Sequence, residues 1–192
     1  MSAAIETAGH RTISLNYPST RLPLDAHVSQ VLQVLEHLEG LQRVSFVTHS
    51  LGGIVTRGLL ANGVWPERLE KGRVVMVAPP NQGAAFARIL QNALPKAFGA
   101  AVGPSGFEIA NGPPYPEPSV PVMVIAGRPR KGLGLNPFLK NDHDFVVEVE
   151  ETKLSSMTEH MVVDAPHTFI MNHPETESAA VRFLAPLLDS AE

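Results

Sequence analysis

The stretch Val44-Ser45-Phe46-Val47-Thr48-His49-Ser50-Leu51-Gly52-Gly53-Ile54-Val55 decides how this chain folds. Residues 44–47 are nearly all apolar, which is typical of a parallel strand that is covered on both faces. Residues 53–61 form a second apolar segment, which we predict to be a helix. Ser50 lies between the two segments, and the glycines that follow it leave room for a tight turn. The sequence therefore predicts a strand, a turn that carries Ser50, and a helix.

A strand-turn-helix around a serine suits nucleophilic catalysis. A serine hydroxyl is a poor nucleophile unless a histidine takes its proton, and a sharp turn exposes the hydroxyl for that transfer. The usual pattern of such a turn is Gly-x-Ser-x-Gly; here Thr48 replaces the first glycine and Gly52 keeps the second. We interpret residues 48–52 as a nucleophile elbow with Ser50 as the nucleophile. The alternative is an ordinary strand-to-helix connection that contains a serine.

Length and composition limit the possible classes of protein. The chain of 192 residues fits one domain, and we assign residues 1–192 to it. The net charge of -4 and the scattered Lys and Arg residues predict no nucleic-acid partner. The absence of cysteine excludes disulfides, thiolate metal ligands and a cysteine nucleophile. Residues 1–10 are too polar for a signal peptide, and no apolar run reaches the roughly 20 residues that span a bilayer, so we expect a cytoplasmic chain without a transmembrane segment.

Strand and helix patterns alternate along the chain. We expect strands at residues 12–16, 44–47, 74–78, 122–126 and 161–163, and helices at residues 28–38, 53–61, 84–94 and 178–188. Residues 99–121 are rich in Pro and Gly and have no regular period, so we interpret them as an irregular loop, either a lid or a structural excursion. The alternation predicts an α/β fold: a mostly parallel sheet of about five strands with helices on both faces.

An acid and a base for Ser50 should follow the strands, because functional groups collect beyond the carboxyl ends of an open parallel sheet. Asp144 follows the strand expected at residues 122–126, and His167 follows the strand expected at residues 161–163. In this interpretation His167 takes the Ser50 proton and later donates it to the leaving group. Asp144 then fixes the imidazole tautomer and stabilises the imidazolium.

Asp142 and Asp164 are alternatives to Asp144 as the acid. Each lies in a polar segment where a carboxylate more usually forms a solvated turn. We favour Asp144, and the sequence leaves the other two open.

His173 and His49 are alternatives to His167 as the base. His173 precedes Pro174, as at the start of a helix, so we assign it a structural role. His49 is adjacent to Ser50, but neighbours at an elbow point in different directions, so we expect it to pack or to form a hydrogen bond nearby. The eight histidines include no paired motif on one helix, so we predict no metal site, and the reaction needs no cofactor.

Five short motifs carry a family resemblance. They are Asn16-Tyr17-Pro18-Ser19, His49-Ser50-Leu51-Gly52-Gly53, Pro79-Pro80-Asn81-Gln82-Gly83, Asp144 followed by Val149-Glu150-Glu151-Thr152, and His167-Thr168-Phe169. Together they resemble the α/β-hydrolase superfamily, in particular its small lipase-like and esterase-like members, which share the chain order Ser, Asp, His. The resemblance covers nearly the whole chain. It implies a Ser50-Asp144-His167 triad that cleaves carboxylic esters through an acyl-enzyme, with a small acyl ester or lipid as substrate.

The chain departs from that family at its amino-terminal end. Family members normally have a further strand, a His-Gly type loop and a helix upstream of the strand that matches residues 12–16; only residues 1–11 precede it here. The loop ordinarily supplies one of two N–H donors of the oxyanion hole, and the other is the Leu51 N–H. Losing one donor costs on the order of 100–1,000-fold in turnover. We expect catalysis to survive if Ser19 or Thr20 points at the space beside Ser50.

The departure also has structural and functional consequences. We expect a reduced α/β-hydrolase fold in which residues 12–16 pair directly with the strand at residues 44–47. The missing helix leaves apolar surface beside the closing helix, which suggests a homodimer through that face. The alternative function is a non-catalytic or N-terminally truncated hydrolase-like scaffold that binds a ligand or a partner.

Overall fold

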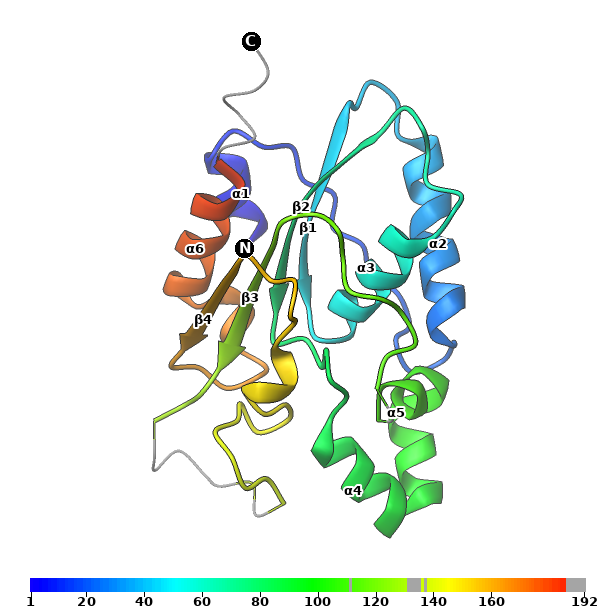
Figure 1. Ribbon diagram of the computed structural model, residues 1–192, viewed down its shortest axis with the longest axis vertical. Helices are drawn as coiled ribbons and strands as arrows, with labels where there is room; N and C mark the ends of the chain where they lie inside the picture. Colours follow the sequence, from blue (N-terminus) through cyan, green and yellow to red (C-terminus); the bar gives the residue numbers. More distant parts are fainter. Residues whose placement is uncertain (111, 131–135, 137, 186–192) are drawn as a thin grey trace.

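A parallel sheet of four strands forms the centre of the molecule (Figure 1). The computed structural model describes residues 1–110, 112–130, 136 and 138–185. In these residues the strands lie in the order β1 (Arg43–His49), β2 (Glu70–Val77), β3 (Val122–Gly127) and β4 (Glu159–Val163). All neighbouring strands pair in parallel, so their carboxyl ends meet at one edge of the sheet. The α/β prediction is confirmed, with four strands in place of about five.

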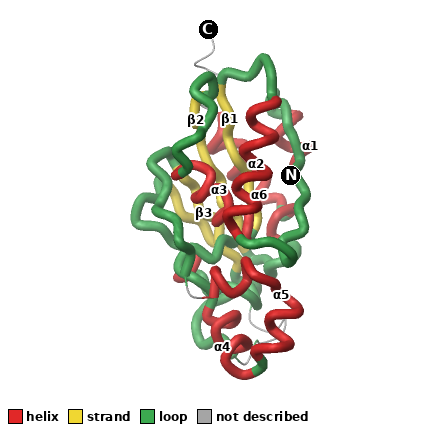
Figure 2. Tube along the Cα trace, turned by 90° about the vertical axis from the view of Figure 1, so that its right-hand side faces the viewer, coloured by secondary structure: helices red, strands yellow, loops and turns green. Residues whose placement is uncertain are grey.

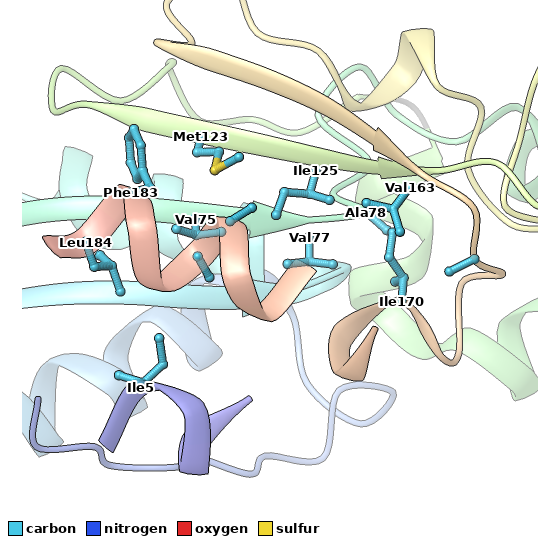
Figure 3. Close-up of a cluster of buried hydrophobic side chains, with 13 residues drawn as sticks. Ile5, Val75, Val77, Ala78, Met123, Ile125, Val163, Ile170, Phe183 and Leu184 are labelled. Carbon is cyan, nitrogen blue, oxygen red and sulfur yellow. The ribbon is translucent and has the colours of Figure 1, made fainter. Parts of the chain in front are cut away.

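Helices cover both faces of the sheet (Figures 1 and 2). On one face α3 (Leu51–Ala61) packs on the strands, and α2 (Leu24–His37) packs on α3. The buried apolar side chains of α2 recur at three- and four-residue steps, as the sequence predicted; they are Leu24, Val28, Val31, Leu32 and Leu35. On the other face α6 (Pro174–Leu184) packs on β2 and β3. Figure 3 shows Phe183 and Leu184 of α6 in the core beside the strands.

Residues 12–16 do not form the predicted strand. They run in an extended segment in which the side chains of Ile13 and Leu15 are 54% and 41% exposed. An alternating pattern forms a strand only where a neighbouring surface buries its apolar side, and these two side chains have no such surface. Within the described residues no strand pairs with the outer edge of β1. The side chains of β1 are therefore half-buried, and the predicted direct pairing with residues 12–16 is wrong.

The first residues form a short helix that the sequence did not predict. Helix α1 (Ser2–Thr7) packs against α6, and its Ile5 side chain joins the core (Figure 3). The amino group of Met1 forms an ion pair with Glu177 of α6. Helix α1 therefore covers part of the face beside the closing helix where the sequence predicted bare apolar surface. The homodimer stays a prediction.

A pair of helices, α4 (Ala85–Ala93) and α5 (Pro95–Ala110), projects beyond the carboxyl edge of the sheet (Figures 1 and 2). The prediction of an irregular loop is therefore wrong for residues 99–110. Pro95 occupies the first helical position, where its missing N–H costs no hydrogen bond. The helix is kinked at Gly103, whose backbone is not helical (φ 64°, ψ -167°), and helical structure continues on both sides of the kink. None of the helices in the described part of the chain is long and apolar enough to cross a bilayer.

The closing segments complete the fold. Two short 3-10 helices, η1 (Glu150–Thr152) and η2 (Ile170–Asn172), lie in the loops before β4 and before α6. Helix α6 begins four residues before the predicted Ser178, and residues 186–188 of the predicted helix lie outside the described residues.

Candidate active site

Ser50 lies on a sharp turn between β1 and α3, as the sequence predicted. Its backbone has φ 52° and ψ -121°, a strained conformation for a residue other than glycine. The Ser50 N–H donates a hydrogen bond to the carbonyl oxygen of Val77, 2.9 Å away, which holds the turn against β2. A Cβ atom at Gly53 would lie 2.9 Å from Pro79 Cβ, so α3 approaches the loop after β2 closely only because residue 53 is a glycine. The local geometry is that of a nucleophile elbow.

Thr48 occupies the position where the usual elbow pattern has a glycine. Its Oγ1 lies 3.4 Å from the carbonyl oxygen of Val75 and donates to it. A Cβ at Gly52 would come within 3.3 Å of Thr48 Cβ, so the second glycine of the pattern provides the space that Thr48 needs.

Asp144 and His167 form a hydrogen-bonded pair at the carboxyl edge of the sheet. His167 Nδ1 lies 2.6 Å from Asp144 Oδ2, and the Asp144 side chain is almost completely buried. Asp144 Oδ1 accepts hydrogen bonds from the N–H groups of Val146 (3.0 Å) and Val147 (2.8 Å). The His167 N–H also donates to the Asp144 carbonyl oxygen at 2.9 Å. These bonds fix the carboxylate and the imidazole ring, and they leave His167 Nε2 for proton transfer.

The Ser50 hydroxyl makes no hydrogen bond within the described residues. The ring of His49, the residue before Ser50, lies 4.7 Å from the ring of His167 between centroids, so His167 packs against the elbow. Catalytic hydrogen bonds of serine nucleophiles are often long without substrate and shorten in the substrate complex.

His49 supports the backbone of His167, in agreement with its predicted role. Its Nε2 donates to the His167 carbonyl oxygen at 3.0 Å. Burial lowers the pKa of His49, and the neighbouring His167 lowers it further, so the imidazole is neutral at pH 7. His49 therefore holds the loop that carries His167.

The alternative residues for the triad lie elsewhere. Asp142 pairs with Arg128 at 2.9 Å, and Asp164 pairs with Arg130 at 2.7 Å, both on the surface. His173 caps α6, where its Nδ1 accepts from the Glu175 N–H at 3.3 Å, as expected for a structural role. Of the three carboxylates, Asp144 is the one beside His167.

A cavity of about 200 Å³ opens above Ser50. Ser50 and Leu51 line it from the elbow, and Ser19 and Thr20 line it from the turn that precedes α2. The remaining wall is mainly apolar and comes from α4, α5 and the loops; it includes Pro80, Ala84, Ala87, Val102, Ile109, Val146 and Val147. A larger hollow of about 420 Å³ lies between β4 and α6, far from the elbow, and contains none of these residues.

A buried polar scaffold beside the cavity escaped the sequence analysis. Arg57 of α3 donates to the carbonyl oxygens of Asn81 (2.9 Å) and Pro116 (3.1 Å), and burial lowers its pKa. Asn81 Nδ2 donates in turn to the Thr152 carbonyl oxygen at 2.8 Å, which joins two of the sequence motifs. Glu151 accepts the N–H of Ala85 at 2.5 Å and so holds the start of α4. Arg57 is a charged residue inside the otherwise largely apolar segment 51–61, and that feature of the sequence could have indicated this scaffold.

Comparison with known proteins gives the name of the fold. No protein-family model and no curated protein sequence matches the chain. The mature lipase BlEst2 of Bacillus licheniformis superposes with a TM-score of 0.64, at 16% identity over 90% of this chain and 76% of the lipase. The phospholipase PlaB of Legionella pneumophila superposes with a TM-score of 0.61, at 16% identity over 91% of this chain and 49% of the phospholipase. An esterase of Pyrococcus furiosus reaches 0.51, at 20% identity over 86% and 61% of the two chains.

These similarities establish a fold. Identities of 20% or less carry no residue-level assignment, but three lipolytic or esterolytic enzymes share the path of this chain. The chain therefore has an α/β-hydrolase-like fold, and its known structural neighbours include lipases and esterases.

Proposed function

We propose that this chain, with its α/β-hydrolase fold, is a serine hydrolase that cleaves carboxylic esters through an acyl-enzyme. Ser50 is the nucleophile, His167 is the general base and acid, and Asp144 orients the imidazole. The observation that supports this proposal most is the 2.6 Å Asp144–His167 pair, whose imidazole packs on His49, the residue before the strained Ser50. A buried carboxylate paired with a histidine next to such a turn is the arrangement that activates a serine.

Each step follows from these positions. Ser50 Oγ adds to the ester carbonyl carbon while its proton moves to His167 Nε2, and the carbonyl oxygen becomes an oxyanion. The Leu51 N–H, at the first position of α3, has no partner within its own helix and donates to that oxyanion. When the intermediate collapses, the carbon–oxygen bond to the alcohol breaks, and the alcohol leaves with the proton from His167. Water then repeats the sequence on the acylated Ser50, giving the acid and the free enzyme.

The cavity favours a short acyl chain. Its volume of about 200 Å³ is below the roughly 300–1,000 Å³ of sites that enclose drug-sized ligands. Apolar residues of the elbow, α4, α5 and the loops after β2 and Asp144 form most of its wall, which suits an acyl chain and gives no charged partner for a polar one. Short acyl esters are therefore the preferred substrate class of this proposal.

Hydrolysis of p-nitrophenyl acetate and butyrate by purified protein tests the proposal. The matched control is folded Ser50→Ala protein prepared in the same way. We expect turnover that disappears with the Ser50 hydroxyl and that is faster for butyrate than for p-nitrophenyl palmitate. Equal background rates in both proteins would contradict the proposal.

One observation favours the alternative of a non-catalytic scaffold. The Ser50 hydroxyl has no hydrogen bond to His167 in this conformation. A scaffold of this kind would bind an acyl ligand in the cavity without consuming it. Tight binding of butyrate or of an ester with no Ser50-dependent turnover would select this function.

A further inference from the structure

We propose that the hydroxyl of Thr20 donates the second hydrogen bond to the oxyanion, opposite the Leu51 N–H. The inference rests on the proposed ester hydrolysis and assigns the donor that the family's missing loop would ordinarily supply. It follows from the position of the turn at residues 17–21, from the atoms of that turn that are already hydrogen-bonded, and from the packing that holds it.

The turn lines the same cavity as the nucleophile. Ser19 and Thr20 line the same cavity as Ser50 and Leu51. Tyr17 lies directly against the elbow, because its hydroxyl oxygen is 3.5 Å from the position that a Cβ on Gly52 would take. The residues that follow Tyr17 are therefore held next to the first turn of α3.

Several backbone groups of the turn are already hydrogen-bonded. The Ser19 N–H donates to the Tyr17 carbonyl oxygen at 2.8 Å, and the Arg21 N–H donates to the Pro18 carbonyl oxygen at 2.9 Å. The hydroxyl of Ser105 on α5 donates to the Ser19 carbonyl oxygen. The hydroxyls of Ser19 and Thr20 have no partner among the described residues, and both residues line the cavity. Of the two, Thr20 is the residue whose backbone is held against Gly103 of α5, so we assign the donor to its hydroxyl.

Helices α2 and α5 fix the turn in place. The Tyr17 ring packs on the ring of His27 of α2, 4.8 Å away between centroids, and His27 is completely buried. On the other side the Thr20 carbonyl oxygen sits against Gly103 so closely that a Cβ there would overlap it. The kink of α5 at Gly103 therefore makes the space that Thr20 occupies. A donor held in this way needs little reorganisation when charge develops on the substrate.

The chemistry needs a donor that keeps its proton. During the attack the electron pair of the carbonyl π bond moves to oxygen, and the Ser50 proton goes to His167. Thr20 donates a hydrogen bond to the resulting oxyanion and remains protonated through collapse. A side-chain hydroxyl can fill this role as a backbone N–H does, because both present a hydrogen to the developing charge.

The experiment compares kcat and KM for p-nitrophenyl butyrate in three variants. Thr20→Val keeps the branched shape and removes the hydroxyl; we expect kcat to fall by about 100-fold with KM little changed, as for other single oxyanion donors. Thr20→Ser keeps the hydroxyl and should retain most of the activity. Thr7→Val makes the same chemical change on α1, far from the cavity, and should retain wild-type kinetics. Thermal melting establishes that each variant is folded.

The outcomes separate this inference from the proposed function. Ser50-dependent turnover that is unchanged in Thr20→Val overturns the Thr20 role and leaves ester hydrolysis intact. An equal loss in Thr20→Val and Thr20→Ser also overturns it, because the hydroxyl would then not be the active group. Wild-type protein without Ser50-dependent turnover overturns the proposed function and the Thr20 role together.

Discussion

The two sides of the cavity are built in different ways. The sheet side, which carries Ser50, Asp144 and His167, is fixed by backbone hydrogen bonds from residues next to the strands. The cap side, which consists of the turn at residues 17–21 and helices α4 and α5, is held by isolated side-chain contacts and by the close approach at Gly103. In the proposed reaction the sheet side supplies the groups that make and break bonds, and the cap side shapes the space for substrate.

This difference predicts which substitutions should lower the reaction rate directly and which should lower stability or displace the turn at residues 17–21. Groups on the sheet side have short, buried hydrogen bonds, so removing one should affect the reaction strongly. Groups on the cap side act through packing, so their removal should move the turn. The amino-terminal segment that leads into the cap side is exposed and should contribute least.

The largest effect is expected from Asp144→Asn on the sheet side. An amide can still accept the N–H groups of Val146 and Val147, but it favours the wrong tautomer of His167. We expect kcat to fall by about 10⁴-fold while the melting temperature changes little. The Asp142→Asn variant is the matched control, since Asp142 pairs with Arg128 on the surface. Loss of activity in Asp142→Asn alone would contradict the assignment of the acid.

A smaller effect is expected from Gly103→Ala on the cap side. Gly103 has φ 64° and ψ -167°, a conformation that is essentially restricted to glycine and costs about 1–3 kcal/mol for other residues. The added methyl group also overlaps the Thr20 carbonyl oxygen, so the turn must shift. We expect a lower free energy of unfolding in urea together with a lower kcat.

Gly63→Ala is the matched control for Gly103→Ala, because a Cβ at Gly63 meets no atom within 4 Å. Wild-type stability in Gly103→Ala would show that the close approach of α5 to the turn is absent.

Low pH should decrease the free energy of unfolding through His49, which lies on the sheet side. Burial lowers the pKa of His49, and His167 lowers it further, whereas an unfolded histidine titrates near pH 6.5. As the pH falls below about 6.5, the unfolded chain binds a proton that the folded chain excludes, so the free energy of unfolding decreases. We expect His49→Asn to make this decrease shallower in urea titrations between pH 7 and pH 5. The exposed His37→Asn should keep the wild-type slope, and an equal change in both variants would contradict the role of burial.

The smallest effect is expected from Ile13→Val, in the segment of residues 12–16 that precedes the cap side. Ile13→Val removes one methylene from a side chain that is 54% exposed and should change the free energy of unfolding by less than about 0.5 kcal/mol. The same change at the fully buried Ile125 should cost about 0.5–1.5 kcal/mol. Equal costs would mean that residues 12–16 pack on a surface after all.

The same contrast explains how far the sequence could predict the fold and the site. The elbow at Ser50 and the positions of Asp144 and His167 follow from local patterns. Each of these residues comes after a short apolar run, and such a run followed by a turn indicates a buried strand. His173 was assigned correctly for the same reason, since proline after a capping residue marks the start of a helix.

The remaining features depend on neighbours that a local pattern does not contain. The alternation in residues 12–16 indicated a strand, but no surface buries Ile13 and Leu15. Pro and Gly in residues 99–121 indicated an irregular loop, whereas residues 99–110 belong to a helix in which tertiary packing against the turn uses Gly103 as a kink. The Arg57–Asn81 contact joins segments 24 residues apart and needs the fold before it can be seen.

The most direct test of the account is covalent labelling of Ser50. Intact-mass spectrometry of wild-type protein after reaction with a fluorophosphonate should show one phosphonyl adduct, mapped to Ser50 by peptide sequencing, because His167 activates that hydroxyl alone. The Ser50→Ala protein should stay unlabelled. An unlabelled wild-type protein, or an adduct that persists in Ser50→Ala, would contradict the assignment of Ser50 as an activated nucleophile.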